Sequence, residues 1–439
     1  MTEHSRFNYK NGQELRCDAE RMGLHLPWSD DLSVLASPLA VGRRRVSNRF
    51  AALPVEGRDS NFDGTPSELT FRRYRRYAAG GFGLIHFEAA AVWQGGRSSD
   101  RQLLLAEETA PRIKALLEAV REAAAAGLDQ KPLCILQLQE SERYRRATGT
   151  VPGLAWPDAE FDARAKVPQG TPLLTDQELD GILKHMAAAA ALAYQIGFDG
   201  VDVKACHRYL LSELLAARRR PGKYGGSFEN RVRMVLDAID GIRSAVPDPE
   251  FLISSRLNIY DAIAGGWGVG EGLTPDLTEP LKLIGLMERR GVSYISATCG
   301  TPYGRAWVNR PFDRLIPGQP PAPEHPMEGV CRGLELTAAV QKAYPAIPMA
   351  GFGCSWFRQF LPNVAAGAIA EGGAQFAGLG RMIFAYPDMP RDVLSGKGAD
   401  PAKSCVTCSL CSQVMARGGR AGCYVRDREV YDLLKAENR

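Results

Sequence analysis

The stretch that decides the fold is Gly200-Val-Asp-Val-Lys204, a short apolar run between two amphipathic stretches, residues 176–196 and 230–246. An apolar run of this length predicts a buried strand, and the periodicity on either side predicts helices. Thr175 and Asp176 can cap free backbone N–H groups, so they mark the start of the first helix. Helices that alternate with buried strands indicate a parallel sheet.

The same alternation continues in both directions and gives eight units. We expect strands at Arg49–Pro54, Gly83–Glu88, Leu133–Leu138, Val201–Lys204, Phe251–Leu257, Tyr294–Ala297, Ile347–Ala350 and Gln375–Leu379. We expect helices at Leu69–Ala79, Ala110–Ala126, Asp176–Ile196, Asn230–Val246, Thr278–Arg290, Gly333–Tyr344 and Leu361–Glu371. Eight units suit a closed barrel better than an open sheet, so the sequence predicts an α/β fold, a (β/α)8 TIM barrel. Functional residues then belong at the C-terminal ends of its strands.

Three segments follow from this pattern. Residues 37–395 form the barrel, residues 1–36 form an N-terminal extension with a helix at Gly12–Met22 that packs on it, and residues 396–439 form a cysteine-rich C-terminal segment. The stretch Arg305–Pro326 is rich in proline and lacks periodicity, so we interpret it as a long loop after the sixth strand.

Composition excludes several classes of protein. The chain has 439 residues, 45% of them hydrophobic and 24% charged, with a formal net charge of +4. The only dense basic clusters, Arg72–Arg76 and Arg218–Arg220, are interpreted as solvated helix ends, so no nucleic-acid partner is expected. No run of eighteen apolar residues occurs, and residues 1–18 lack an apolar signal core. We therefore expect a cytoplasmic protein without a membrane span.

The strongest local motif is Cys405-Val-Thr-Cys408-Ser-Leu-Cys411, with Cys423 eleven residues later. Three close thiolates and one from a returning loop can surround a small inorganic core, which is a pattern that [4Fe–4S] clusters use. Zinc is the main alternative, although its cysteines more often come as two separated pairs. Four free thiols are a third reading. We expect the cluster.

A second motif begins at the strand quoted above. Residues 200–211 read Gly-Val-Asp-Val-Lys-Ala-Cys-His-Arg-Tyr-Leu-Leu, and Tyr224-Gly-Gly-Ser-Phe-Glu-Asn-Arg231 follows. Both stretches resemble the old yellow enzyme family of flavin-dependent barrels, also called NADH:flavin oxidoreductases. Segments that resemble other strands of the family occur in the expected order: Asn48–Pro54, Gly83–Ala89, Leu136–Leu138 and Gly380-Arg381. With the cysteines, the chain resembles the iron–sulfur branch that contains trimethylamine dehydrogenase and 2,4-dienoyl-CoA reductase.

The resemblance implies FMN at the strand ends. The residues that it places along the isoalloxazine ring are Pro54, Val55, Glu56 and Ala89, with Gln137 at the pyrimidine edge and Arg256 facing N1 and O2. A cation there stabilises anionic reduced flavin. Around the phosphate it places Gly351, Phe352, Gly380 and Arg381. Lys204, His207 and Tyr209 take substrate-facing positions, with Tyr209 at the place of the family's proton donor.

The sequence departs from the family at four positions. Lys204 stands where histidine or tyrosine is usual, and Arg208 replaces a common glycine. Glu140 replaces a common histidine, and Glu56 stands where threonine or cysteine often lies beside the flavin. A carboxylate there opposes added negative charge on the flavin unless it is protonated or paired with a cation.

These residues lead to a first functional hypothesis, the reduction of an activated C=C bond in an unsaturated carbonyl compound. Hydride would pass from FMN N5 to the β-carbon, while Lys204 and His207 polarise the carbonyl oxygen and Tyr209 protonates the α-carbon. Lys204 favours this reading because its charge suits a developing enolate, unless it only pairs with Glu140. An alternative is oxidation of an amine or alicyclic substrate with electrons leaving through the cluster. Glu56 and the cluster itself favour this alternative slightly, since simple NADPH-driven reduction needs no cluster. A third is a zinc-stapled barrel without redox activity.

The source of electrons is open at this stage. The chain lacks a second G-x-G-x-x-G unit that opens a helix after a strand. We therefore expect either a separate electron-transfer partner protein or NAD(P)H that reduces FMN directly from the substrate pocket. The identity of the small-molecule substrate and assembly into a homo-oligomer also stay open.

Overall fold

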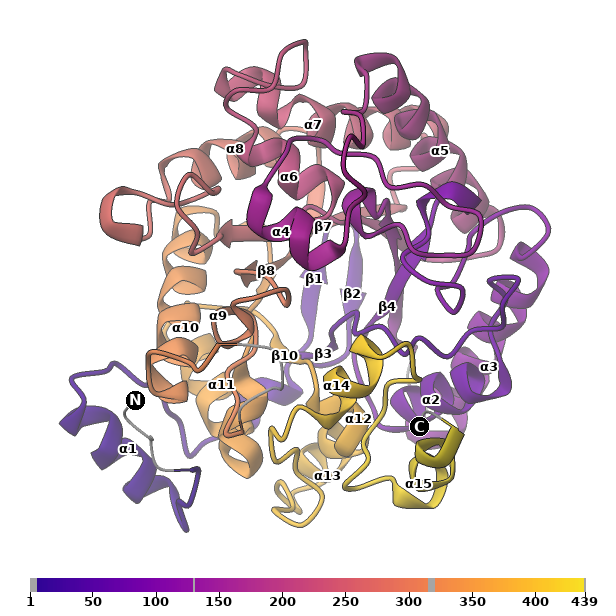
Figure 1. The fold of residues 1–439 in the computed structure, drawn as a ribbon. Helices are drawn as coiled ribbons and strands as arrows, with labels where there is room; N and C mark the ends of the chain where they lie inside the picture. Colours follow the sequence, from indigo (N-terminus) through magenta and orange to yellow (C-terminus); the bar gives the residue numbers. More distant parts are fainter. Residues whose placement is uncertain (1–5, 129–130, 315–319, 438–439) are drawn as a thin grey trace.

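The computed structural model describes residues 6–128, 131–314 and 320–437. Eight parallel strands form a nearly closed barrel with helices around it (Figure 1). The strands are β3 (Phe50–Ala52), β4 (Leu84–Ala91), β5 (Leu133–Gln139), β6 (Gly200–Val203), β7 (Leu252–Tyr260), β8 (Val292–Cys299), β9 (Met349–Ala350) and β10 (Ala377–Leu379). A bridge between Ala350 and Phe376 brings the two edge strands, β9 and β10, together. The predicted (β/α)8 barrel is confirmed.

The eight expected strands all occur, with ends that differ by a few residues. β4, β5 and β7 are buried along their whole length, as parallel strands covered on both faces should be. Their apolar runs are therefore continuous, which is why the sequence predicted them well. β9 keeps only two residues of the expected Ile347–Ala350.

The helices of the outer ring are α2 (Glu68–Ala79), α3 (Ala110–Leu128), α5 (Asp176–Gln195), α7 (Phe228–Ala245), α8 (Thr278–Glu288), α10 (Pro326–Ala343) and α11 (Leu361–Ala370). The expected start of α5 is confirmed, since Thr175 and Glu178 form a reciprocal capping box. The expected start of α10 at Gly333 is wrong. Pro326 occupies the first turn, and His325 caps it. Among the described helices, none is long and apolar enough to cross a membrane.

Shorter helices lie in the connections at the strand ends. They are α4 (Ala159–Ala165), α6 (Leu210–Ala216), α9 (Ala306–Asn309), α12 (Met382–Ala385) and α13 (Met389–Leu394). The prediction of an unbroken loop over Arg305–Pro326 is therefore wrong at α9, and its residues 315–319 lie outside the described part of the chain. Four residues are too few to produce a helical period in the sequence.

A hairpin of β1 (Leu39–Val41) and β2 (Arg44–Val46) closes the N-terminal end of the barrel. Val41 and Val46 are fully buried and belong to the same apolar cluster as Leu84, Leu133 and Leu252, which lie at the starts of barrel strands. The sequence did not predict this hairpin, since three-residue strands are too short to establish alternation. As a result, ligands can reach the barrel interior from the opposite end.

The N-terminal extension contacts the barrel through α11. α1 (Gly12–Arg21) is followed by Trp28, whose backbone crosses α11 so closely that a Cβ on Gly367 would lie 2.2 Å from it. The Ser29 N–H also donates to the carbonyl oxygen of Asn363 at 3.1 Å. The boundaries proposed for the three segments stay a prediction.

The C-terminal segment holds α14 (Leu410–Ala416) and α15 (Arg428–Glu437), drawn in yellow in Figure 1. Asp427 pairs with Arg72 of α2 at 2.8 Å. Arg73 of the same cluster is buried against Asp59 at 2.8 Å. The interpretation of these arginines as solvated helix ends is therefore wrong, because they attach α2 to neighbouring segments.

Candidate active site

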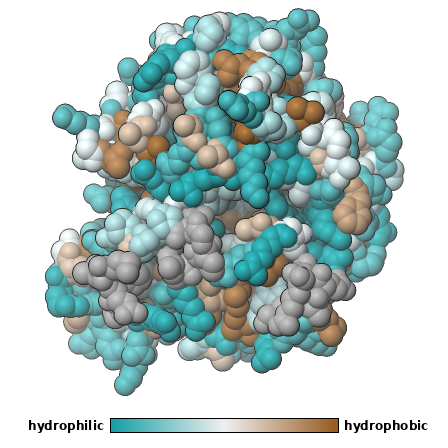
Figure 2. Space-filling view, viewed as in Figure 1, coloured by the Kyte–Doolittle hydropathy of each residue, from teal (hydrophilic) through white to brown (hydrophobic). Residues whose placement is uncertain are grey.

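A cavity of about 1010 Å³ lies at the C-terminal ends of the barrel strands. Much of the molecular face seen from this side is hydrophilic (Figure 2). Eleven of the thirteen residues predicted to contact flavin or substrate line this cavity: Pro54, Val55, Glu56, Gln137, Lys204, His207, Tyr209, Arg256, Phe352, Gly380 and Arg381. Residues from six strands, β3, β5, β6, β7, β9 and β10, thus meet at one place, although their individual roles stay predictions.

The other two predicted residues do not line the cavity. Ala89 is fully buried within β4, and its carbonyl oxygen accepts a hydrogen bond from Gln102 at 3.1 Å. Gly351 directly follows β9 and lies one residue before the lining residue Phe352. Either residue could contact a flavin only through its backbone or through a neighbouring residue.

Asp202 organises the floor of the cavity from β6. Its carboxylate accepts the backbone N–H of Arg256 at 2.7 and 2.8 Å. It also accepts from the Gln137 amide at 3.4 Å and lies 3.3 Å from His86 Nε2. Asp202 therefore positions two predicted flavin contacts on the neighbouring strands β5 and β7.

Four of the arginines that line this cavity have no acidic partner among the described residues and at least one buried guanidinium nitrogen without a hydrogen bond there. They are Arg58, Arg256, Arg310 and Arg381. Burial, with the nearby Arg381 charge, lowers the pKa of Arg310 to about 10. Since an unpaired buried cation costs several kcal/mol, the arrangement fits an anionic ligand.

These features fit FMN. Arg310 and Arg381 can meet a phosphate, and Arg256 can meet the N1–O2 edge of a flavin. A Cβ on Gly380 would find no protein atom nearer than 4.0 Å, so room for a ligand remains beside its backbone. Glu56 is the single carboxylate among the lining residues, so the cavity attracts anions.

Lys204 is buried, and its ammonium group contacts three neighbouring side chains. Its Nζ lies 3.6 Å from Glu56 Oε1, donates to Gln139 Oε1, and lies 4.0 Å from the centre of the Tyr209 ring. The alternative that Lys204 pairs with Glu140 is wrong, because Glu140 accepts instead from Arg145 at 2.6 Å. Burial lowers the pKa of Lys204, and Glu56 opposes that shift.

His207 is held by its ring nitrogen. Nε2 lies 2.8 Å from the Asn309 amide nitrogen and 3.3 Å from the Thr298 hydroxyl. The same amide nitrogen donates to the Cys299 carbonyl oxygen, so it is assigned as a donor and Nε2 as an acceptor. Burial and the charges of Arg256, Lys204 and Arg310 hold the pKa of His207 well below its usual value. The imidazole is therefore neutral at pH 7, with its proton on Nδ1.

Tyr209 lies against the inner side of the connection between β5 and α5. Its hydroxyl is 2.8 Å from that of Tyr303, and its ring packs with Tyr144 and Ala165. Burial raises the pKa of Tyr209 well above its usual value, so the phenol stays protonated at neutral pH. A protonated phenol in a substrate cavity can act as a general acid.

The turn that carries these side chains is strained. His207 and Arg208 both have φ of 63°, in the left-handed region that favours glycine. Each such non-glycine residue costs roughly 1–2 kcal/mol. Neighbouring contacts must therefore hold the turn in place.

The cysteine motif adjoins the same cavity. Cys411 lines it, and all four cysteines of the motif are partly buried and free of disulfides. The pKa of Cys405 is raised to about 12 by burial, and the Cys411 and Cys423 thiols contribute to the shift. The thiols are thus near neighbours. Among the described residues, however, no three His, Cys, Asp or Glu side chains are placed to hold a metal ion.

The loop around the cysteines has features that suit an inorganic core. Thr407 and Ser409 have positive φ, and their buried hydroxyls have no hydrogen-bond partner among the described residues. The Arg426 N–H donates to Cys423 Sγ at 3.3 Å, the kind of bond that tunes cluster thiolates. The donor set therefore fits a [4Fe–4S] cluster, which stays a proposal.

Sequence reasoning missed three residues of the site: Tyr303, Asn309 and Arg310. All three come from the connection after β8, where proline and the short α9 hide any periodicity. An arginine or tyrosine in such a loop is usually solvated, so no signal in the sequence could have distinguished them.

A family model for the NADH:flavin oxidoreductase / NADH oxidase family matches residues 34–279, more than half of the chain. The chain belongs to this family. The NADH:flavin oxidoreductase match covers β1 to β7, with Gln137, Lys204, His207, Tyr209 and Arg256, and ends before β8, β9, β10 and the cysteines. Membership in this family implies an FMN-type oxidoreductase, while the reaction of this chain is a matter for proposal.

Curated relatives match most of this chain. A metal reductase of Desulforamulus reducens is 26% identical over 382 residues, which is 86% of this chain and 51% of the relative. An NADH oxidase of Thermoanaerobacter brockii is 26% identical over 379 residues, which is 84% of this chain and 52% of the relative. The chain thus spans about half the length of these NADH:flavin oxidoreductase relatives.

Solved structures share the fold. A 2-naphthoyl-CoA reductase in complex with 2-naphthoyl-CoA has a TM-score of 0.69 at 23% identity, covering 90% of this chain and 56% of its own. Histamine dehydrogenase from Rhizobium sp. 4-9 has a TM-score of 0.67 at 19% identity, covering 89% and 52%. At these identities, the similarity establishes the barrel alone.

Proposed function

We propose that the chain is an FMN-dependent oxidoreductase that reduces an activated C=C bond of an unsaturated carbonyl compound. The observation that carries the proposal is the meeting of Lys204, His207 and Tyr209 in one cavity with Gln137 and Arg256. FMN, when bound, supplies the hydride equivalent that such a reduction needs. NAD(P)H is the proposed donor of reducing equivalents, in keeping with the family.

The three side chains have complementary protonation states. Lys204 is a cationic donor and neutral His207 carries its proton on Nδ1, so both can donate hydrogen bonds to a carbonyl oxygen and stabilise developing enolate charge. Tyr209 keeps its proton because burial raises the pKa of the phenol. It can then deliver that proton to the α-carbon, with the Tyr303 hydroxyl 2.8 Å behind it.

Oxidation of an amine or alicyclic substrate is the second candidate. Its two supports are the cluster, which simple NADPH-driven reduction does not need, and Glu56, because an unpaired carboxylate beside the flavin opposes its reduction. Glu56 lies 3.6 Å from Lys204 Nζ, so a cation balances its charge. That ion pair weakens the argument from Glu56 and favours reduction of a carbonyl compound.

The same proposal includes a [4Fe–4S] cluster at Cys405, Cys408, Cys411 and Cys423, which would relay electrons one at a time. Cys411 supports the relay because it lines the cavity proposed for FMN. Zinc in place of the cluster would leave the segment structural. A separate electron-transfer protein is one proposed partner of such a cluster.

Anaerobic purification, a visible spectrum and identification of released flavin test the cofactor assignment directly. We expect non-covalent FMN, and we expect reduced holoprotein to be reoxidised by 2-cyclohexen-1-one, a simple enone. Release of FAD, or no flavin, would refute the cofactor assignment. Turnover of amines with no reaction toward enones would favour the second candidate.

Tyr209→Phe tests the proton donor. We expect the rate of reoxidation by the enone to fall by about 10²–10⁴-fold, the usual range for general acid catalysis. Reduction of the flavin by NAD(P)H should stay close to that of the parent, because the phenol acts only when the product needs a proton. Stopped-flow absorbance resolves the two half-reactions. Equal reoxidation rates would remove Tyr209 from the mechanism.

A further inference from the structure

The left-handed turn after β6 holds an arginine where the backbone favours glycine. Arg208 has φ of 63° and follows His207, which has the same φ. A large side chain gives this conformation no intrinsic stability. The contacts of the Arg208 side chain must therefore stabilise the turn.

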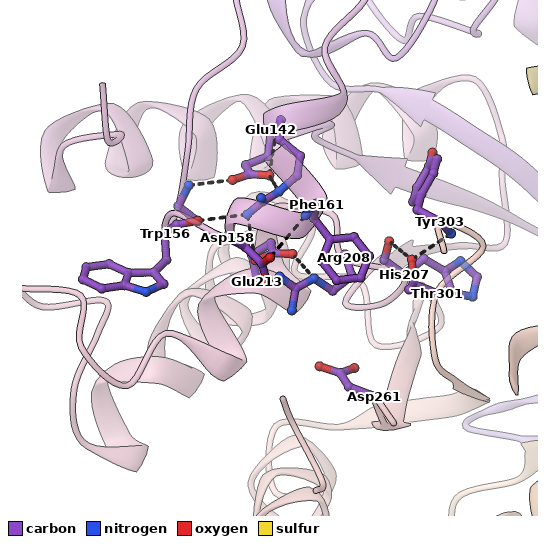
Figure 3. A network of polar contacts seen from close by, with 12 residues as sticks. Glu142, Trp156, Asp158, Phe161, His207, Arg208, Glu213, Asp261, Thr301 and Tyr303 are labelled. Carbon is purple, nitrogen blue, oxygen red and sulfur yellow. Dashed lines mark hydrogen bonds and ion pairs between the residues drawn. The ribbon is translucent and has the colours of Figure 1, made fainter. Parts of the chain in front are cut away.

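Arg208 is 5% exposed and makes three contacts with its guanidinium group (Figure 3). Nη2 donates to Asp158 Oδ2 at 2.7 Å, and Nε forms an ion pair with Glu213 Oε1 at 2.5 Å. The guanidinium carbon also lies 4.4 Å from the centre of the Phe161 ring. Two of these partners, Asp158 and Phe161, belong to the connection between β5 and α5.

We call residues 140–175 of this connection the cover. Asp158 is the N-cap of α4 in the cover, where its Oδ1 accepts from the N–H groups of Glu160 and Phe161 at 3.1 and 3.2 Å. One carboxylate therefore caps α4 with one oxygen and binds Arg208 with the other. At the far end of α4, Ala165 belongs to the same buried apolar cluster as Tyr144 and Tyr209.

A second buried arginine joins the same network. Arg143 Nη2 donates to Glu213 Oε2 at 3.0 Å, and Nη1 donates to Asp162 of α4. Glu213 of α6 thus accepts a hydrogen bond from Arg143 and forms an ion pair with Arg208. The cover, α6 and the strained turn are held together by charge-assisted contacts at buried positions, where they are strong.

We propose that Arg208 is a positioning residue that holds the cover over Tyr209 and keeps His207 and Tyr209 in the turn that faces the substrate. It acts through Asp158, Glu213 and Phe161 and does not line the cavity. Glycine would allow this turn without fixing the cover. Arg208 therefore makes the outer wall of the pocket rigid, which restricts the shapes of substrate that fit.

The proposal rests on the proposed function only in the reacting roles of His207 and Tyr209. The first experiment therefore needs no turnover. Arg208→Gly, as FMN holoprotein, should fold because glycine suits φ of 63°, yet amide hydrogen exchange across α4 should rise at least tenfold. Arg208→Lys keeps the positive charge but loses the planar guanidinium group. Its rate of amide hydrogen exchange across α4 should therefore lie between those of the parent and Arg208→Gly.

Asp158→Asn and Glu160→Gln are the matched pair on α4. Asparagine caps a helix about as well as aspartate, so Asp158→Asn removes only the ionic partner of Arg208. We therefore expect faster amide hydrogen exchange across α4 in Asp158→Asn as well. Glu160 pairs with Arg164 on the exposed side of α4 at 3.2 Å, outside the network, so Glu160→Gln should leave exchange unchanged.

The second experiment measures reoxidation by 2-cyclohexen-1-one against enone concentration. Arg208→Gly and Asp158→Asn should lower the limiting rate at least tenfold with unchanged flavin content, and Arg208→Lys should recover part of it. Parent-like exchange rates across α4 in both Arg208→Gly and Asp158→Asn would overturn the proposal. Faster exchange in these variants combined with parent-like reoxidation rates would overturn it too. If the parent does not react with enones, the proposed function fails, and the exchange comparison still decides the role of Arg208. If Arg208→Gly does not fold, Asp158→Asn against Glu160→Gln decides it.

Discussion

At the scale of single residues, Lys204 determines what charge the pocket can receive. Its Nζ lies 3.6 Å from Glu56 Oε1, on the side proposed for the flavin, and 4.0 Å from the centre of the Tyr209 ring, on the side proposed for the substrate. A buried lysine whose charge is only partly balanced by one carboxylate can still attract a second anion. An enolate or phenolate oxygen placed between Lys204 and His207 would meet two donors.

Lys204→Met should therefore weaken binding of a phenolate ligand at least tenfold, or about 1.4 kcal/mol, because it removes the cation and keeps the side-chain length. The measurement is a titration of oxidised FMN holoprotein, followed by the charge-transfer band of the bound phenolate. Lys223→Met is the control, since that lysine pairs with Asp180 at the surface. Unchanged phenolate affinity in Lys204→Met would make Lys204 a structural residue.

His207 should make the protein less stable in mild acid. Its pKa in the folded protein lies well below 6.5, so below pH 6.5 the unfolded chain binds a proton that the folded protein does not. The free energy of unfolding therefore falls as the pH drops below 6.5, by up to about 1.4 kcal/mol per pH unit from this group.

His207→Gln removes the titrating group and should flatten this part of the pH profile. Thermal unfolding of parent and variant holoprotein between pH 5 and 8 measures the difference. His185→Gln is the control, because His185 stacks on Trp93 at 5.6 Å, away from the lining residues of the cavity. Parallel profiles for parent and His207→Gln would contradict the assignment of His207 as a buried neutral group.

At the scale of elements, the sequence predicts the barrel strands better than it predicts the connections that follow them. The apolar runs of β5 and β7 were predicted within three residues, because burial on both faces leaves a continuous signal. α9 was not predicted. Its last residue, Asn309, and the following Arg310 reach the cavity from a segment whose sequence only indicates a loop.

The same contrast holds in the site. Gln137, Lys204 and Arg256 could be placed because each lies in or directly after a recognisable strand that resembles the family. The pairing of Lys204 with Glu56, and that of Glu140 with Arg145, could not be predicted, since strand order alone does not determine which side chain crosses to which neighbour. Arg208 was noticed only as a departure, and the cover that it contacts is irregular in sequence.

Arg310, which directly follows the unpredicted helix α9, allows a test of the proposed phosphate site. Arg310→Met should lower the affinity for FMN by about tenfold or more, because hydrogen bonds to charged groups contribute about 1.5–3 kcal/mol. Fluorescence titration of apoprotein with FMN gives the dissociation constant. Arg289→Met, at an exposed position just after α8, should leave it unchanged. An unchanged affinity in Arg310→Met would place the phosphate elsewhere.

At the scale of the whole molecule, two cofactor sites are proposed on one wall. The C-terminal segment reaches the barrel at several points, among them Ala421 N–H to Gly57 O at 2.6 Å and Arg58 Nη1 to Met415 O at 3.1 Å. Gly57 and Arg58 follow β3 next to Glu56. The segment with the cysteines is thus attached beside the place proposed for the flavin.

Cys408→Ser should remove most of the four irons and four inorganic sulfides that we expect per chain. The broad absorbance beyond the flavin bands should disappear with them, and the C-terminal segment should become easier to cleave with protease. Iron and sulfide assays on anaerobically prepared protein measure the first effect. Cys17→Ser, at an exposed position in α1, is the control. Stoichiometric zinc in the parent would contradict the cluster.

The hairpin of β1 and β2 has a kinetic consequence. Because Val41 and Val46 seal the N-terminal end of the barrel, a nicotinamide and an oxidising substrate that both react with one flavin must use the same mouth. They would visit it alternately, each leaving before the other arrives. Initial rates measured at several fixed concentrations of one reactant should then give parallel double-reciprocal lines, and an excess of either reactant should slow the other.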